Sequence, residues 1–121
     1  MASRGRNRVA IVGRCDPRLR DLIADVLRDL GVEISDAPVL GDPPAVVLAV
    51  AERANLTAVL DLAKAVAGRG PILAVVPLED ERLEHAAASQ GAHACYTLGA
   101  PLGRLRALVA KLLGEKEPAA N

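Results

Sequence analysis

Few side chains in this sequence combine the type and the spacing that catalysis or metal binding requires. Cys15 and Cys95 lie 80 residues apart and match no metal or redox spacing, so we interpret both as small buried hydrophobic residues. His85 and His93 are eight residues apart and have no third ligand at a useful spacing. Ser89 lacks the G-x-S-x-G context of a nucleophilic serine. We therefore expect no enzymatic activity, no metal and no cofactor.

Two arginines, Arg14 and Arg18, are the best candidates for binding a small ligand. They stand between an apolar run and a helical pattern, where nucleotide-binding folds place a phosphate loop. Only one glycine, Gly13, precedes them, so neither the G-x-G-x-x-G pattern nor the P-loop pattern is met. The two guanidinium groups and a helix N-terminus could still hold an anion at the carboxyl edge of a sheet. Binding of a nucleotide or second messenger is therefore an alternative function.

Composition and charge favour one globular domain without affinity for polyanions. The chain has 121 residues, of which 51% are apolar and 25% charged, enough to build a core. Basic and acidic residues both total 15, and one Tyr is the only aromatic residue that could stack on a base. We therefore expect no nucleic-acid partner, and we interpret the arginine-rich residues 1–8 as a flexible tail.

The hydropathy pattern argues against a membrane protein. The longest apolar runs, such as residues 45–51, are far shorter than the roughly 20 residues that span a bilayer. No charged-then-apolar leader opens the sequence. We expect no membrane partner and a cytoplasmic location.

Short apolar runs and helical patterns alternate along the chain. Strands are predicted at 9–13, 32–37, 45–51, 71–77 and 92–98. Helices are predicted at 17–30, 55–67, 79–90 and 101–114. The expected inner stripe of the first helix is Leu19, Leu22, Ile23, Val26, Leu27 and Leu30. This alternation implies an α/β domain over residues 9–114, a parallel sheet covered on both faces, and a flexible tail at 115–121.

The segment 38–44 interrupts the alternation. It holds three prolines and a glycine in seven residues, which excludes a regular helix. The second crossover helix should therefore be shortened or replaced by a loop. Such a loop would leave part of the first or third strand open to a partner.

Three stretches of the chain follow one pattern in frame. The first strand is followed by Arg14-Cys15-Asp16-Pro17 and by a helix that ends in Gly31-Val32-Glu33-Ile34. The later stretches are PILAVVP at 71–77 and GAHACYTLG at 91–99. Together they resemble the receiver domain of bacterial response regulators. The resemblance implies a flavodoxin-like, doubly wound, five-stranded parallel sheet in the order 2-1-3-4-5.

The same resemblance implies which positions would carry aspartyl phosphorylation. The acidic pair that holds Mg²⁺ in the family falls on Arg14 and Cys15. The hydroxyl falls on Val76, the lysine on Leu98, and the nucleophilic aspartate near Val50. None of these side chains suits Mg²⁺ or a phosphoryl oxygen. The chain therefore resembles a degenerate pseudo-receiver.

Glu52 is the only carboxylate near the expected nucleophile position, and its role stays open. It could imitate a permanently charged phosphoaspartate or contact an anionic ligand together with Arg14. It could also pair with Arg14 in a fixed salt bridge, or be an ordinary loop carboxylate, which is the simpler interpretation.

The resemblance implies a role in protein binding through the fourth helix, the fifth strand and the last helix. The partner would be a signalling or scaffold protein in bacterial signalling, and a homodimer through the same face is also expected to be possible. The candidate surface residues are Arg82, Glu84, Ala87, Tyr96, Arg104, Arg106 and Lys111. Their mixed charges are expected to determine how a partner is oriented on this surface more than how tightly it binds.

Overall fold

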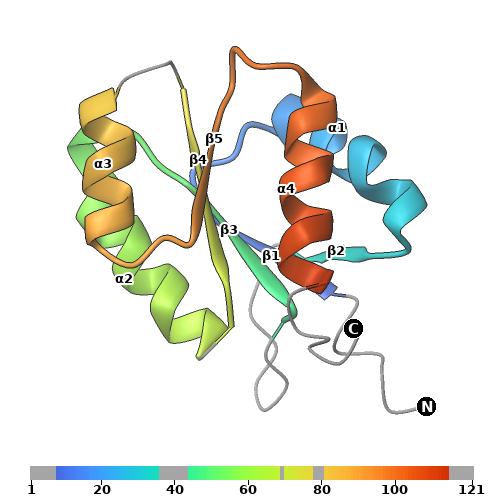
Figure 1. Ribbon diagram of the computed structural model, residues 1–121, viewed down its shortest axis with the longest axis horizontal. Helices are drawn as coiled ribbons and strands as arrows, with labels where there is room; N and C mark the ends of the chain where they lie inside the picture. The colour runs from blue at the N-terminus through green and yellow to red at the C-terminus, as the bar shows by residue number, and fades with distance from the viewer. Residues whose placement is uncertain (1–7, 36–43, 69, 78–80, 115–121) are drawn as a thin grey trace.

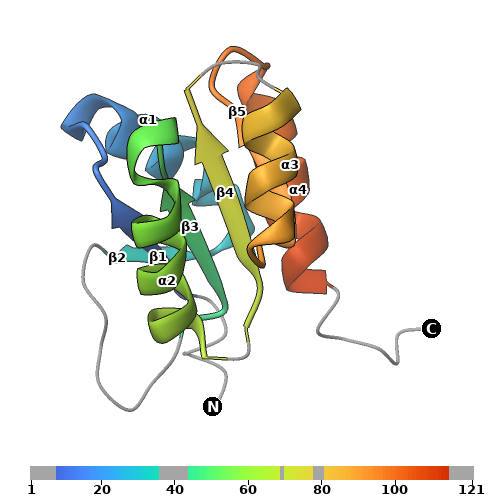
Figure 2. The same ribbon diagram turned by 90° about the vertical axis from the view of Figure 1, so that its left-hand side faces the viewer.

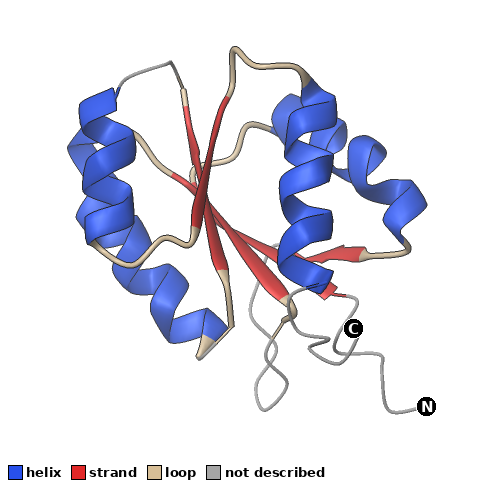
Figure 3. Ribbon diagram, viewed as in Figure 1, coloured by secondary structure: helices blue, strands red, loops and turns tan. Residues whose placement is uncertain are grey.

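The computed structural model describes residues 8–35, 44–68, 70–77 and 81–114, which form a five-stranded sheet with helices on both faces (Figure 1). The strands are β1 (Arg8–Gly13), β2 (Glu33–Ser35), β3 (Val46–Val50), β4 (Ile72–Val76) and β5 (Ala94–Thr97). The helices of these residues are α1 (Pro17–Leu27), α2 (Leu56–Ala67), α3 (Glu81–Ser89) and α4 (Leu102–Gly114). Within the described ranges, strands and helices alternate along the chain, and residues 36–43, which join β2 to β3, lie outside those ranges (Figure 3).

The strand order β2-β1-β3-β4-β5, with parallel pairing throughout, confirms the predicted fold class. Arg8, which was expected in the tail, is the first residue of β1 and lies beside Glu33 of β2. The ladder between β1 and β2 thus extends one residue further than the apolar pattern indicated. Residues 38–43 of the expected loop, and most of both expected tails, lie outside the described residues. No described helix is long and apolar enough to cross a membrane.

The sheet is the middle of three layers. Helices α2 and α3 cover one face, and α1 and α4 cover the other (Figures 1 and 2). Every residue of β3 and β4 is buried, as expected for parallel strands packed on both faces. The core therefore consists of two apolar clusters, one on each side of the two central strands.

The expected opening on one face of the sheet is wrong. Ala10 and Val12 of β1 and Val47 and Ala49 of β3 are all buried in the cluster beneath α2 and α3. They are buried because α2 lies across β1, β3 and β4. On β2, only Ile34 joins a core cluster, the one beneath α1 and α4. Its neighbours in the strand are polar, so this edge presents little apolar surface to the other face.

Helix α1 begins and ends where its sequence signals lie. The Asp16 side chain accepts a hydrogen bond from the backbone N–H of Arg18 at 3.3 Å, and Pro17 takes the first helical position. A 3₁₀ turn over Arg28–Leu30 extends the helix to Gly31, which has the positive φ of a left-handed C-terminal residue. Leu22 was expected on the inner stripe, but it is 47% exposed. It lies at the margin of the apolar stripe, beyond the reach of the core.

One ion pair joins the end of α1 to α4. Arg106 Nε donates to both carboxylate oxygens of Asp29, at 3.1 and 3.2 Å. This hydrogen bond holds the pKa of the Asp29 carboxyl below its usual range. The pair joins the 3₁₀ turn after α1 to α4 and is solvent-exposed, so it adds little to the free energy of unfolding.

The turn after β1 depends on Gly13. Its φ is 95°, a value that side chains other than glycine rarely adopt. A Cβ atom at Gly13 would overlap the carbonyl oxygen of Val50 on the neighbouring strand and would lie 3.1 Å from Cγ1 of Val59. The close approach of β1 to β3 at this point therefore requires glycine.

We predict that Gly13→Ala lowers the free energy of unfolding by at least about 2 kcal/mol, because backbone strain and overlap with a carbonyl add to each other. Gly103→Ala in α4 is the matched control, since a Cβ there meets nothing within 4 Å. It should keep the stability or raise it by up to about 1 kcal/mol. Urea unfolding followed by circular dichroism measures both values. Equal effects of the two substitutions would contradict the role of Gly13.

Candidate functional site

A small cavity lies at the carboxyl edge of the sheet, where the parallel strands end together. Its volume is about 110 Å³. Three of the positions at which the resemblance located phosphoryl chemistry, Arg14, Val50 and Leu98, line it together. The other lining residues are Asp16, Leu19, Ala51, Glu52, Asn55, Val75 and Pro77. The topology therefore gathers the loops that follow β1, β3, β4 and β5 around one site.

Two of the expected positions lie away from this cavity. Val76 is fully buried in the cluster on the α2 and α3 side of the sheet. Its neighbours Val75 and Pro77 line the cavity instead, because successive residues of a strand face opposite sides. Cys15 is half-buried, and its thiol lies 3.7 Å from the backbone carbonyl of Asp16 as a weak donor. Neither residue is placed to meet a ligand in the cavity.

The floor of the cavity is apolar. Val50, Val75 and Leu98 pack against the core beneath α1 and α4. Such side chains offer no oxygen to a Mg²⁺ ion and no donor to a phosphoryl group. Among the described residues, no cluster of three or more His, Cys, Asp or Glu side chains could hold a metal ion.

The two carboxylates on the rim are engaged as helix caps. Asp16 caps α1, as described above. Glu52 caps the 3₁₀ turn Arg53–Asn55 that leads into α2, and its side chain accepts from the backbone N–H of Asn55. In return, the backbone N–H of Glu52 donates to the side-chain oxygen of Asn55 at 2.7 Å. This reciprocal pair is a capping box.

The capping box bears on the roles considered for Glu52. Glu52 caps the turn that precedes α2, and Asn55, which stands at the N-cap position of α2, completes the box. In the described part of the chain, Arg14 and Glu52 share the cavity rim without forming an ion pair. The arrangement supports an ordinary structural carboxylate rather than a phosphoaspartate mimic.

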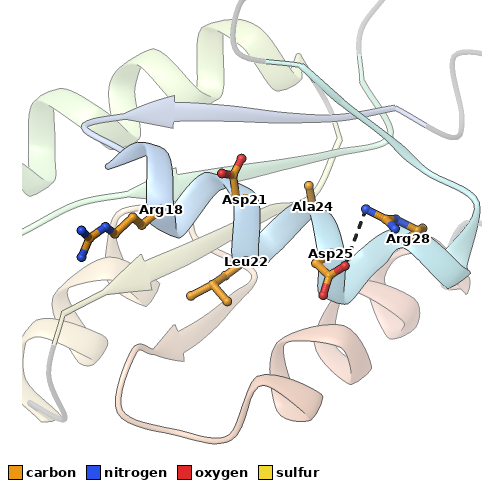
Figure 4. A pocket seen from close by; sticks show the side chains of 6 residues that line it. All are labelled: Arg18, Asp21, Leu22, Ala24, Asp25 and Arg28. Carbon is orange, nitrogen blue, oxygen red and sulfur yellow. Dashed lines mark ion pairs between the residues drawn. The ribbon is translucent and has the colours of Figure 1, made fainter.

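Arg18 does not join Arg14 at this cavity. It lines a separate, open depression along the outer side of α1, together with Leu22, Asp25, two other residues of α1 and Arg28 of the following 3₁₀ turn (Figure 4). The expected anion site therefore has one arginine, and two carboxylates face it from the same rim. Its volume of about 110 Å³ is also well below the roughly 300–1,000 Å³ of typical ligand pockets.

The second candidate site surrounds edge strand β5, which lies between α3 and α4 (Figures 1 and 2). Arg82 on α3 and Arg104 and Lys111 on α4 are exposed, and Glu84 is half-buried. Glu84 accepts a hydrogen bond from the Thr97 hydroxyl at 3.0 Å, which joins α3 to β5. The face thus has a charged margin on both sides of the strand.

Three residues expected on this face are unsuited to contact a partner directly. Ala87 is fully buried beneath α3, and Tyr96 is 1% exposed. The Tyr96 ring fills the core on the α4 side, where its hydroxyl donates to the carbonyl of Ala100 at 2.6 Å and burial raises its pKa. Arg106 is committed to Asp29. The inclusion of Ala87 and Tyr96 in the surface was wrong, because both side chains point into the core.

Sequence reasoning missed two features near β5. Burial raises the pKa of the Cys95 thiol to about 11, and the negative charge of Glu84 adds to this effect. His93 Nδ1 accepts from the backbone N–H of Ile72 at 3.0 Å, and the backbone N–H of His93 donates to the Ile72 carbonyl at 2.8 Å. His93 therefore extends the pairing of β4 and β5 through its backbone and its Nδ1 atom. No spacing in the sequence carries either signal.

Comparison with known proteins identifies the fold. No family model and no curated protein matches the chain. Among solved structures, a CheY-like protein (TadZ) from Pseudomonas aeruginosa has a TM-score of 0.71 at 18% identity, over 88% of this chain and 98% of that one. A CheY-like receiver domain protein from Methanospirillum hungatei has a TM-score of 0.72 at 18% identity, over 93% and 97%. An orphan response regulator of H. pylori gives 0.69 at 18% identity, over 91% and 98%. The chain has the receiver-domain fold.

We predict that Glu52→Ala lowers the free energy of unfolding by about 1 kcal/mol, because it removes a capping acceptor. Glu52→Gln keeps an acceptor oxygen and should lose less than half of that amount. Urea unfolding of both variants beside the wild type measures the difference. If Glu52→Gln lowers the free energy of unfolding as much as Glu52→Ala does, the charge of Glu52 stabilises the fold, and a capping hydrogen bond alone does not explain its contribution.

Proposed function

We propose that this chain, which has the receiver fold, is a phosphorylation-independent pseudo-receiver of bacterial signalling that acts by binding another protein. The observation that carries the proposal is the cavity at the carboxyl edge of the sheet. Its floor is apolar, its cation is Arg14, and both of its carboxylates cap helices. A receiver fold with such a cavity lacks the groups for phosphoryl transfer but still has outer surfaces to which a partner protein can bind.

Aspartyl phosphorylation requires three things at one place. A carboxylate must attack phosphorus, a divalent metal must neutralise the phosphoryl oxygens, and a donor must stabilise the charge that develops. Val50 and Leu98 stand where two of these groups would be needed, and neither can supply them. The Arg14 guanidinium occupies space beside them and repels a metal ion. These residues therefore favour a domain that is not switched by phosphorylation.

The surface around β5 is the best-supported contact for a partner. β5 is an edge strand, so one side of its backbone lacks a neighbouring strand. Arg104 and Lys111 are seven residues apart and share one exposed face of α4. Together with the mixed charges of α3, they supply a pattern that a signalling or scaffold protein with acidic groups can recognise. Ligand binding near Arg14 has less support, because the cavity is small and Arg18 lies elsewhere.

The first test exposes the protein to Mg²⁺ with acetyl phosphate or beryllofluoride. We expect no phosphoryl group in the intact mass and no shift of the thermal midpoint, because no described residue at the cavity combines a free carboxylate with a metal site. A receiver domain with a complete acidic site, treated in parallel, is the positive control. Mg²⁺-dependent labelling that disappears in Asp16→Asn or Glu52→Gln would overturn the proposal.

The second test compares captured proteins from the native cell. We expect a signalling or scaffold protein to co-purify with the wild type and to be reduced at least about tenfold with Arg104→Glu/Lys111→Glu, because reversing both charges opposes an acidic partner. Asp61→Lys on the exposed face of α2 is the matched control and should capture as much as the wild type. Equal capture by all three proteins, or a loss confined to Asp61→Lys, would reject the β5 face.

A further inference from the structure

The outer side of α1 carries an exposed leucine between two opposite charges. Leu22 is 47% exposed, although it is a large apolar residue. Arg18 precedes it by four residues and Asp25 follows it by three, so the three side chains form one stripe along the helix. They line an open depression of about 640 Å³, and Figure 4 shows Leu22 and Asp25 on one side of α1 with Asp21 on the other.

These charges are incompletely satisfied within the chain. The described residues provide no ion pair for the Arg18 guanidinium. Asp25 has one partner, Arg28, at 3.6 Å, and both side chains are largely exposed. An exposed pair of this kind contributes little and exchanges easily for a better one.

The stripe is complementary to itself under a two-fold rotation. Leu22 lies within one residue of the midpoint between Arg18 and Asp25. If a two-fold axis passes beside Leu22, two copies of α1 run antiparallel, and Arg18 of each copy meets Asp25 of the other. A parallel arrangement would instead place like charges together. Isologous contacts of this kind require a surface that matches itself.

We propose that a second copy of this chain docks on α1, with the two Leu22 side chains in contact at the axis and two Arg18–Asp25 ion pairs on either side. The neighbouring helix α4 leaves room for this approach. Gly103 and Ala110 share the face of α4 that carries Arg106, and a Cβ at Gly103 would meet nothing within 4 Å.

The proposed contact is small and independent of the β5 face. One face of an 11-residue helix with a margin of α4 buries less than the roughly 800 Å² per partner of a stable complex, so the dimer should form reversibly at high concentration. Arg104 is two residues from Arg106 and therefore points about 200° away around α4. A dimer through α1 thus leaves both β5 faces available, and this inference does not rest on the proposed function.

Sedimentation equilibrium of the full chain, up to about 1 mM, where weak association becomes visible, tests the proposal. The wild type should dimerise, and Leu22→Glu should remain a monomer, because it places a charge at the axis. Leu62→Glu on α2 is the matched control, since Leu62 is 49% exposed and should leave the dimer unchanged. A monomeric wild type, or a dimer lost in Leu62→Glu and kept in Leu22→Glu, would overturn the proposal.

A charge exchange tests the pairing itself. Arg18→Asp and Asp25→Arg should each weaken dimerisation at least about tenfold, because each places like charges together twice. The double variant Arg18→Asp/Asp25→Arg should recover it, since both ion pairs form again with their signs exchanged. Circular dichroism verifies that each variant is folded. If the double variant dimerises no better than the single variants, the proposed register is rejected.

Discussion

Burial of β3 and β4 on both faces is the constraint on which the rest of this structure depends. Each residue of these strands contacts a core cluster, so each must be apolar, and a lone charge there would be left without water or a partner. Val50 and Val75 carry this apolar character up to the carboxyl edge of the sheet. The polar groups of the site are consequently confined to the loops and the 3₁₀ turn, on Arg14, Asp16, Glu52 and Asn55.

The loop residues then act on the backbone. Asp16 and Glu52 each satisfy N–H groups at the start of a helical segment, and Gly13 gives β1 its close approach to β3. The core beneath them holds no aromatic residue except Tyr96, whose hydroxyl is satisfied by a backbone carbonyl. The fold is thus maintained by aliphatic packing and local caps, and the charged side chains of α1, α3 and α4 lie at the surface.

Elements with a strong periodic signal were predictable from the sequence, and contacts between distant elements were not. The apolar runs indicated the central strands, and Asp16, Pro17 and Gly31 marked the limits of the first helix correctly. The apolar spacing could not reveal that Leu22 lies beyond the edge of the core. The sequence also does not show which face of β4 each side chain occupies. Val76 was therefore assigned to the phosphoryl site, although Val75 and Pro77 line the cavity. The Arg106–Asp29 pair joins residues 77 positions apart, for which no local pattern exists.

The apolar floor of the cavity also restricts how this sequence can evolve. An aspartate at position 50 would enter a site that is 8% exposed and would lose most of its contact with water, with Arg14 as the basic side chain on the same cavity. A lysine at position 98 would meet a rim whose carboxylates, Asp16 and Glu52, already cap helical segments, and an acidic residue at position 14 would face the same two carboxylates. A substitution made alone at position 14 or 50 therefore carries a cost in charge repulsion or desolvation.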